Sequence, residues 1–98
     1  MLFAVLFTDK PGHGLLRAEH LEAHIRWVDQ NKNVVLVAGS LRSEPQDTPK
    51  GGLWIAEAES KAQVMQIMAT DPFFICGLRL SVDVLHWSKA LEQHQALI

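Results

Sequence analysis

The order in which hydrophobic patterns follow one another along the chain constrains the fold more than any other feature. Four short segments have the continuous or alternating apolar character of strands, and two longer segments repeat apolar residues every three or four positions, as helices do. The strand patterns lie near residues 2–8, 34–38, 53–56 and 78–84, and the helical patterns near 15–30 and 60–70. The order is therefore β-α-β-β-α-β, which predicts an α+β domain of the ferredoxin-like type. In that arrangement both helices cover one face of a four-stranded antiparallel sheet.

Local signals refine these boundaries. The uninterrupted, β-branched run at residues 34–38 predicts a central strand. Residues 40–50 contain two prolines and predict a surface loop or a hairpin arm. Ser60 and Gln63 have the spacing of a capping box, which places the start of the second helix. We expect residues 73–77 to form a short connector after that helix.

The first predicted helix carries two neighbouring stripes of side chains. The apolar stripe, which we expect to be buried against the sheet, consists of Ala18, Leu21, Ile25 and Val28. The second stripe is rotated from it by about 100° and consists of Arg17, His20, His24 and Trp27. We expect this second stripe at the margin of the core, where a pocket between helix and sheet would open.

Length, charge and cysteine content limit the class of protein. The 98 residues fit one domain, expected to span 1–98 with a C-terminal tail from about residue 88 that forms a frayed helix. A net charge of −2 argues against a nucleic-acid partner, which needs a basic face. No apolar run approaches the roughly 20 residues of a membrane span, so no membrane partner is expected. The single cysteine, Cys76, and the lack of a recognisable secretory signal favour the cytoplasm.

The predicted sheet leaves one face without helices. The strand at residues 2–8 is apolar on both of its faces, and the strand at 34–38 is apolar throughout. Soluble monomers rarely expose an apolar patch of that size. We therefore expect a homodimer in which two sheets pack face to face. The alternative is that the loop at 40–50 and the C-terminal tail cover this face.

Two histidines and one aspartate are the candidates for chemistry. An imidazole at a pocket margin can titrate near neutral pH and transfer a proton. The same spacing also fits two histidines without function on a half-exposed helix. Asp71, followed by Pro72, can be an ordinary helix N-cap or a carboxylate that orients a histidine. Spacing alone does not choose between these roles.

A metal site is a weaker alternative. His20 and His24 are four residues apart, so both rings could face one ion. Leu21 stands where the zinc protease motif requires glutamate, and a third ligand would have to come from elsewhere, for example His13 or Asp71. We therefore predict neither a metal nor a bound cofactor.

Taken together, the motifs resemble those of the YCII-related family from about residue 2 to residue 87. The matching pieces, in chain order, are Asp9-Lys10-Pro11-Gly12, Arg17, His24-Ile25-Arg26-Trp27-Val28, Val35-Leu36-Val37-Ala38-Gly39, Gly52-Leu53-Trp54-Ile55, Asp71-Pro72-Phe73, Gly77 and His86-Trp87. The resemblance implies a ferredoxin-like fold assembled as a dimeric α/β barrel. It also implies that His24 and Asp71 are the active-site pair, and it places His20 at the pocket rim or on the surface.

The sequence departs from the family pattern at two positions. Ser40 stands where proline commonly follows the Ala-Gly pair, and Leu21 stands where many members have arginine or another polar residue. A basic group near the site is therefore missing at Leu21, and Arg17 is the candidate to replace it.

The resemblance implies a small acid–base enzyme without a cofactor, with lyase- or isomerase-type chemistry on a small, for example cyclic, metabolite. In this interpretation His24 is the general acid or base, and Asp71 fixes its tautomer or favours its protonated form. Arg17 and Trp27 line the substrate pocket, and Gly39 and Ser40 lie at its mouth. The alternative is a non-catalytic small-molecule-binding or accessory module in which His24 and Asp71 are structural.

Overall fold

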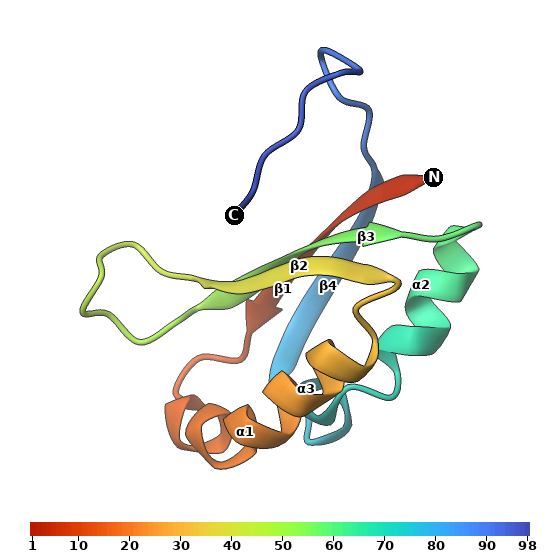
Figure 1. The fold of residues 1–98 in the computed structure, drawn as a ribbon. Coiled ribbons are helices and arrows are strands. Elements are labelled where there is room, and N and C mark those ends of the chain that lie inside the picture. The colour runs from red at the N-terminus through yellow and green to blue at the C-terminus, as the bar shows by residue number, and fades with distance from the viewer.

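The four strands form a single antiparallel sheet, and the helices lie along one of its faces (Figure 1). The structure, a computed structural model, describes every residue from Met1 to Ile98. Its elements are β1 (Leu2–Asp9), α1 (Gly14–Gln30), β2 (Val35–Leu41), β3 (Gly51–Glu57), α2 (Lys61–Met68), α3 (Pro72–Ile75) and β4 (Arg79–His86). The strand order is β2-β3-β1-β4. The ferredoxin-like α+β prediction is thus confirmed, and no helix is both long and apolar enough to cross a membrane.

Capping interactions position the two short helices. The Ser60 hydroxyl accepts a hydrogen bond from the Gln63 amide at 3.1 Å, so α2 begins where the capping box predicts. The predicted connector at 73–77 contains instead the single helical turn α3. Asp71 caps this turn and Pro72 occupies its first position, a combination that favours a helix start. Gly77 follows the turn with a φ of 81°, a conformation that glycine adopts without strain.

Two other expectations about secondary structure are wrong. The apolar run at 34–38 belongs to β2, which is an edge strand, because β3 and β1 occupy the centre of the sheet. The run is apolar because Val34 and Val35 are buried in the core. The tail after β4 forms no helix and extends away from the body of the domain (Figure 1). An isolated helix that short is marginal in water without a surface to pack on.

The predicted orientation of α1 is also wrong. Its buried residues are Arg17 and Trp27, whereas Leu21 is exposed and Ile25 is 58% exposed. The helix therefore turns its mixed polar stripe, and not its apolar stripe, towards the sheet. Burial of polar groups is tolerated when each finds a partner, and the buried groups of this stripe do so, as described below.

The two faces of the sheet differ in what they pack against. Phe3, Val5 and Phe7 of β1 point towards the helices and form the core with Trp54 of β3 and with residues of α1 and α2. The opposite face, which we call the open face, carries no helix. Apolar residues that are half-buried or exposed on it are Leu2, Ala4, Leu6, Val37, Leu41, Leu53, Ile55 and Leu85. The loop at 40–50 and the tail leave Leu6, Leu41 and Leu85 exposed within the single chain.

Candidate active site

The structure brings His24 and Asp71 together. Nδ1 of His24 lies 2.7 Å from Oδ1 of Asp71, although the two residues are 47 positions apart. His24 projects from the middle of α1, and Asp71 is the N-cap of α3. Asp71 is fully buried, and the His24 side chain is only 12% exposed. A hydrogen bond between side chains in so dry an environment is strengthened by the low local dielectric constant.

Both partners of this pair are held in place by other contacts. Oδ1 of Asp71 also accepts the amide N–H of Phe73 at 3.0 Å, so the capping bond of α3 fixes the carboxylate. The Phe73 ring stacks on the His24 ring with centroids 4.1 Å apart and planes 12° apart. The imidazole therefore has little freedom to rotate.

The orientation of His24 determines which of its nitrogens is available. A carboxylate only accepts hydrogen bonds, so Nδ1 carries the proton and donates it to Asp71. Nε2 then has a free lone pair, and no residue of the protein bonds to it. This is the arrangement in which a histidine can accept a proton from a bound molecule.

His24 lines a cavity of about 540 Å³ between α1 and strands β2 and β3. That volume is within the range of small-molecule sites. Its apolar wall consists of Ala18, Leu21, Ile25, Val28, Ala38, Trp54 and Phe73. Ala18, Leu21 and Ile25 of the apolar stripe thus line this cavity and remain exposed, whereas Val28 also packs against the core.

Two arginines share one aspartate at the end of this cavity. Arg17 Nε donates to Oδ2 of Asp9 at 3.0 Å, and Arg79 Nη1 donates to Oδ1 of the same carboxylate at 2.8 Å. Both guanidinium groups also lie 5.0 Å from the centre of the Phe73 ring. Burial lowers the pKa of Arg79, and its hydrogen bond to Asp9 opposes that shift.

Arg79 lines the cavity, although no sequence pattern singles it out. It lies in β4, where apolar and polar residues alternate, and its side chain is only 6% exposed. The pairing of Asp9 with Arg79 across β1 and β4 is the one signal that could have identified it. That signal becomes visible only when the register of the sheet is known.

The other predicted pocket residues divide into two groups. Arg17, Gly39 and Ser40 line the cavity as expected. Trp27 does not, because its ring packs against Trp54 and its Nε1–H donates to the Thr70 hydroxyl at 2.9 Å. The aromatic group in the cavity wall next to His24 is Phe73, and Trp54 completes that wall.

His20 lies outside the cavity, on the exposed side of α1, and its Nε2 is 4.0 Å from Glu19. No three histidine, cysteine, aspartate or glutamate side chains lie close enough together to hold a metal ion. Cys76 is half-buried, and its thiol lies 3.5 Å from the carbonyl oxygen of Phe73.

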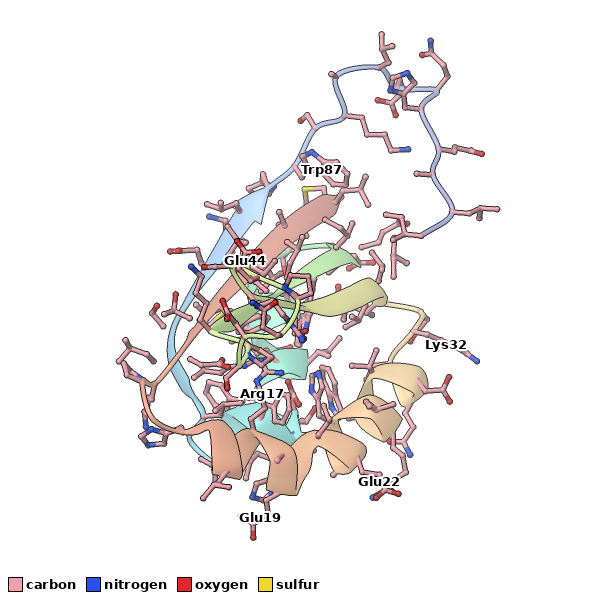
Figure 2. The ribbon with its side chains drawn as sticks, turned by 90° about the vertical axis from the view of Figure 1, so that its left-hand side faces the viewer. Arg17, Glu19, Glu22, Lys32, Glu44 and Trp87 are labelled. Carbon is pink, nitrogen blue, oxygen red and sulfur yellow. The ribbon has the colours of Figure 1, made fainter.

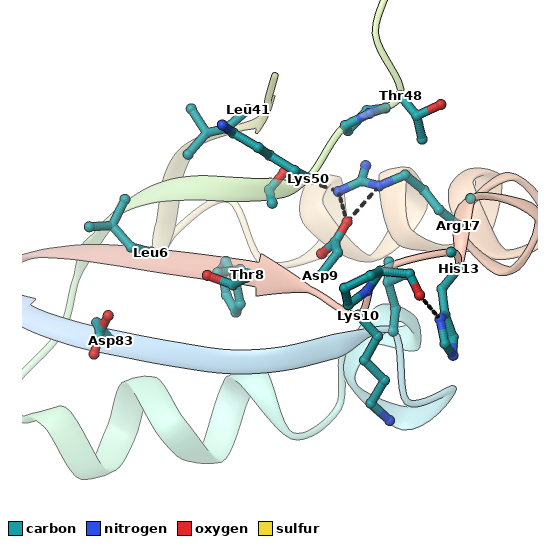
Figure 3. Close-up of a pocket in the computed structure, with 17 residues that line it drawn as sticks. Leu6, Thr8, Asp9, Lys10, His13, Arg17, Leu41, Thr48, Lys50 and Asp83 are labelled. Carbon is teal, nitrogen blue, oxygen red and sulfur yellow. Dashed lines mark hydrogen bonds and ion pairs between the residues drawn. The ribbon is translucent and has the colours of Figure 1, made fainter. Parts of the chain in front are cut away.

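A second cavity, of about 690 Å³, lies on the other side of Arg17 (Figure 3). It is lined mainly by polar residues of the 9–14 turn and of the 40–50 arm, together with Asp83 of β4. Lys10, Lys50 and His13 contribute positive or titratable groups, and Asp9 and Asp83 contribute carboxylates. His24 does not reach this cavity, so the chemistry of the histidine belongs to the first one.

Comparison with known proteins agrees with this fold. The model of the YCII-related domain matches residues 1–88. The structure is similar to that of 5-chloro-2-hydroxyhydroquinone dehydrochlorinase (TftG) from Burkholderia phenoliruptrix in complex with 2,5-dihydroxybenzoquinone. The TM-score is 0.81 and the identity 29%, over 90% of this chain and 94% of that one. No curated protein matches the sequence of this chain.

Two more distant structures share the fold alone. A candidate antibiotic biosynthesis monooxygenase from Bacteroides thetaiotaomicron has a TM-score of 0.59 at 13% identity, over 99% of this chain and 95% of that one. At3g17210 from Arabidopsis thaliana has a TM-score of 0.51 at 18% identity, over 92% and 95%.

Proposed function

Because the chain belongs to the YCII-related family, we propose that it is a small acid–base enzyme in which His24 and Asp71 transfer a proton to and from a small organic molecule. The observation that carries the proposal is the 2.7 Å hydrogen bond between a fully buried carboxylate and a histidine that lines a cavity. The similarity to a dehydrochlorinase supports lyase-type chemistry on a cyclic compound.

In the proposed mechanism Nε2 of His24 accepts a proton from an O–H or C–H bond of the bound molecule. Asp71 stabilises the imidazolium that forms and keeps the Nδ1–H tautomer in place. In a dehydrohalogenation the electron pair released by this deprotonation forms a new double bond and expels halide. The imidazolium then returns its proton to water. Such a proton transfer contributes about 10²–10⁴ to the rate and requires no cofactor.

We further propose that the active form is a homodimer whose two open faces pack against each other. The open face is apolar and carries no helix, and the partner that fits it is the open face of a second copy of the chain. The single, half-buried Cys76 is compatible with a reducing compartment, so the proposed location is the cytoplasm.

The catalytic proposal is tested by turnover of 5-chloro-2-hydroxyhydroquinone, with chloride release as the measurement. We expect release by the wild-type protein and a decrease of about 10²-fold or more in the variant His24→Asn, which removes the base. His20→Asn is the matched control, because it makes the same change one turn earlier on α1, outside the cavity. If the two variants release chloride at equal rates, His24 is not the base.

A further inference from the structure

We propose that the cavity beside α1 binds an anionic ligand, and that Arg79 and Arg17 hold its negatively charged oxygen. The ligand class is a small, flat molecule that carries a carboxylate or an ionised enol or phenol group. This inference rests on the proposed function only in that it names the class of molecule bound at the same site.

The charged side chains of the cavity wall are all of one sign. Among the residues that line this cavity are three arginines and one histidine, but no aspartate or glutamate. The neighbouring cavity, in contrast, mixes lysines with Asp9 and Asp83. A concave site lined by one sign of charge attracts ligands of the opposite sign.

Hydrogen-bond donors of both buried arginines remain unused. Arg17 uses Nε and Nη2, the latter for the Gly51 carbonyl at 3.1 Å, and Arg79 uses only Nη1. Arg17 Nη1 and Arg79 Nη2 bond to no residue, and neither is among the buried polar atoms without a partner. They are therefore accessible, although the two side chains are only 10% and 6% exposed. Figure 2 shows Arg17 pointing from α1 towards the sheet.

The arginines carry more hydrogen-bond donors than the neighbouring carboxylates occupy. Asp9 accepts from both guanidinium groups, so one carboxylate is shared by two cations. Asp71 also interacts electrostatically with Arg79, but its hydrogen bonds, to His24 and the Phe73 amide, are made through Oδ1, and its Oδ2 has no hydrogen-bond partner. An anionic oxygen would therefore accept hydrogen bonds from donors that neither carboxylate uses, and these donors are already held in place.

The geometry also explains what the anion site does for the reaction. Phe73 contacts both guanidinium groups and stacks on His24, so the two cations and the base surround one aromatic ring. A Cβ atom added at Gly52 would lie 3.6 and 3.7 Å from the Arg79 nitrogens, so the wall is closely fitted there. Negative charge that develops on the ligand when His24 removes a proton would then face cationic donors that are fixed in place.

Titration calorimetry near neutral pH with matched pairs of probes tests the proposal. Each pair has one anion and one neutral analogue of nearly the same shape: benzoate and benzamide, 2-hydroxybenzoate and 2-hydroxybenzamide, and 2,5-dihydroxybenzoquinone and its dimethyl ether. We expect at least one anion to bind about tenfold or more tightly than its neutral analogue, which is the size of a charge-assisted hydrogen bond.

Variants locate the origin of this preference. In Arg79→Met we expect the anion to lose most of its advantage, whereas Lys10→Met removes a charge that lines only the neighbouring cavity and should leave the preference unchanged. Arg79→Lys keeps the positive charge beside Asp9 and should bind the anion with intermediate affinity, which covers the case in which Arg79→Met does not fold.

Three results would overturn the proposal: no anion binds below roughly 10 mM, the neutral analogues bind equally well, or the preference persists in Arg79→Met. The variant His24→Asn distinguishes failure of the anion site from failure of the proposed function. If turnover depends on His24 but binding shows no preference for anions, the anion site is wrong and the enzyme proposal stands. If His24→Asn keeps both the preference and full turnover, the anion site stands and the base assignment fails.

Discussion

The two faces of the sheet place charged and aliphatic side chains differently. The face covered by helices buries three charged residues, Asp9, Arg17 and Asp71, beside its hydrophobic core. The open face is dominated by aliphatic residues, and Leu6 at its centre is 37% exposed. Burial of charges is costly unless each is paired, and exposure of aliphatic groups is costly unless a partner covers them. The covered face thus contains the cavity of the proposed site, whereas the open face is the surface that the proposed homodimer would use for association.

The strongest test of the covered face is the variant Asp9→Asn. It removes the one carboxylate that forms ion pairs with both buried guanidinium groups, those of Arg17 and Arg79. We expect the free energy of unfolding to decrease by about 3–5 kcal/mol, the usual cost of breaking a buried ion pair. Urea denaturation followed by tryptophan fluorescence measures this change.

The matched control for this variant is Asp29→Asn, which removes the same charge from a residue of α1 whose side chain is 78% exposed. We expect it to change the free energy of unfolding by less than about 0.5 kcal/mol. Replacing Arg79 by methionine in the Asp9→Asn background should recover part of the lost stability, because it removes one unpaired cation. Equal effects of the two single variants would show that the buried cluster is not important for stability.

The second prediction concerns activity rather than folding. Asp71→Asn retains an oxygen that can accept the Phe73 amide, so α3 should keep its cap. The amide cannot stabilise an imidazolium as a carboxylate does, and it permits the wrong tautomer of His24. We expect kcat to decrease by about 10²–10⁴-fold while the unfolding midpoint changes little, as measured by turnover and thermal unfolding of the same preparation.

Asp71→Ala sharpens this result, because it removes the cap together with the charge. We expect it to lose activity as Asp71→Asn does and, in addition, about 1 kcal/mol or more of stability. An Asp71→Asn variant with wild-type kcat would contradict a catalytic role for the pair.

The third prediction addresses the open face. Leu6 lies opposite Leu53 and Asp83 on neighbouring strands, so Leu6→Glu places a charge at the centre of this face. Because a charge cannot be buried between two apolar sheets without a partner, we expect the mass measured by light scattering to fall from two chains to one. Leu15→Glu is the control, since Leu15 is 88% exposed on α1 and lies away from the open face. A wild-type protein that is already monomeric at micromolar concentration would rule out the homodimer.

The parts of the molecule that the sequence predicts well are those set by local rules. The order of strands and helices along the chain, the capping box at Ser60 and the meeting of His24 with Asp71 follow from short patterns or from the family resemblance. The orientation of α1 could not be predicted in this way, because hydrophobic periodicity assigns the apolar stripe to the core. Here the polar stripe is buried instead, and its partners, Asp9 and Asp71, lie on other elements.

Long-range pairing explains the remaining failures. Arg79 meets Asp9 from 70 residues away, and no local pattern indicates that a charged strand residue is buried. Trp27 has the helical spacing of a pocket residue, but its hydrogen bond to Thr70 draws it into the core. Residues whose position depends on a distant polar partner are thus the ones that the sequence alone places wrongly.

The smallest expected effect comes from deletion of the C-terminal tail. Residues 89–98 are almost entirely exposed, and the tail extends on the side of the sheet opposite the helices (Figures 1 and 2). Their deletion should change the free energy of unfolding of the single chain by less than about 0.5 kcal/mol, since they bury little surface. The light-scattering mass of the deleted protein then decides the role of the tail. If the mass stays at two chains, the sheets alone form the contact, whereas a mass of one chain means that the tail covers apolar surface of the partner and so belongs to the association face.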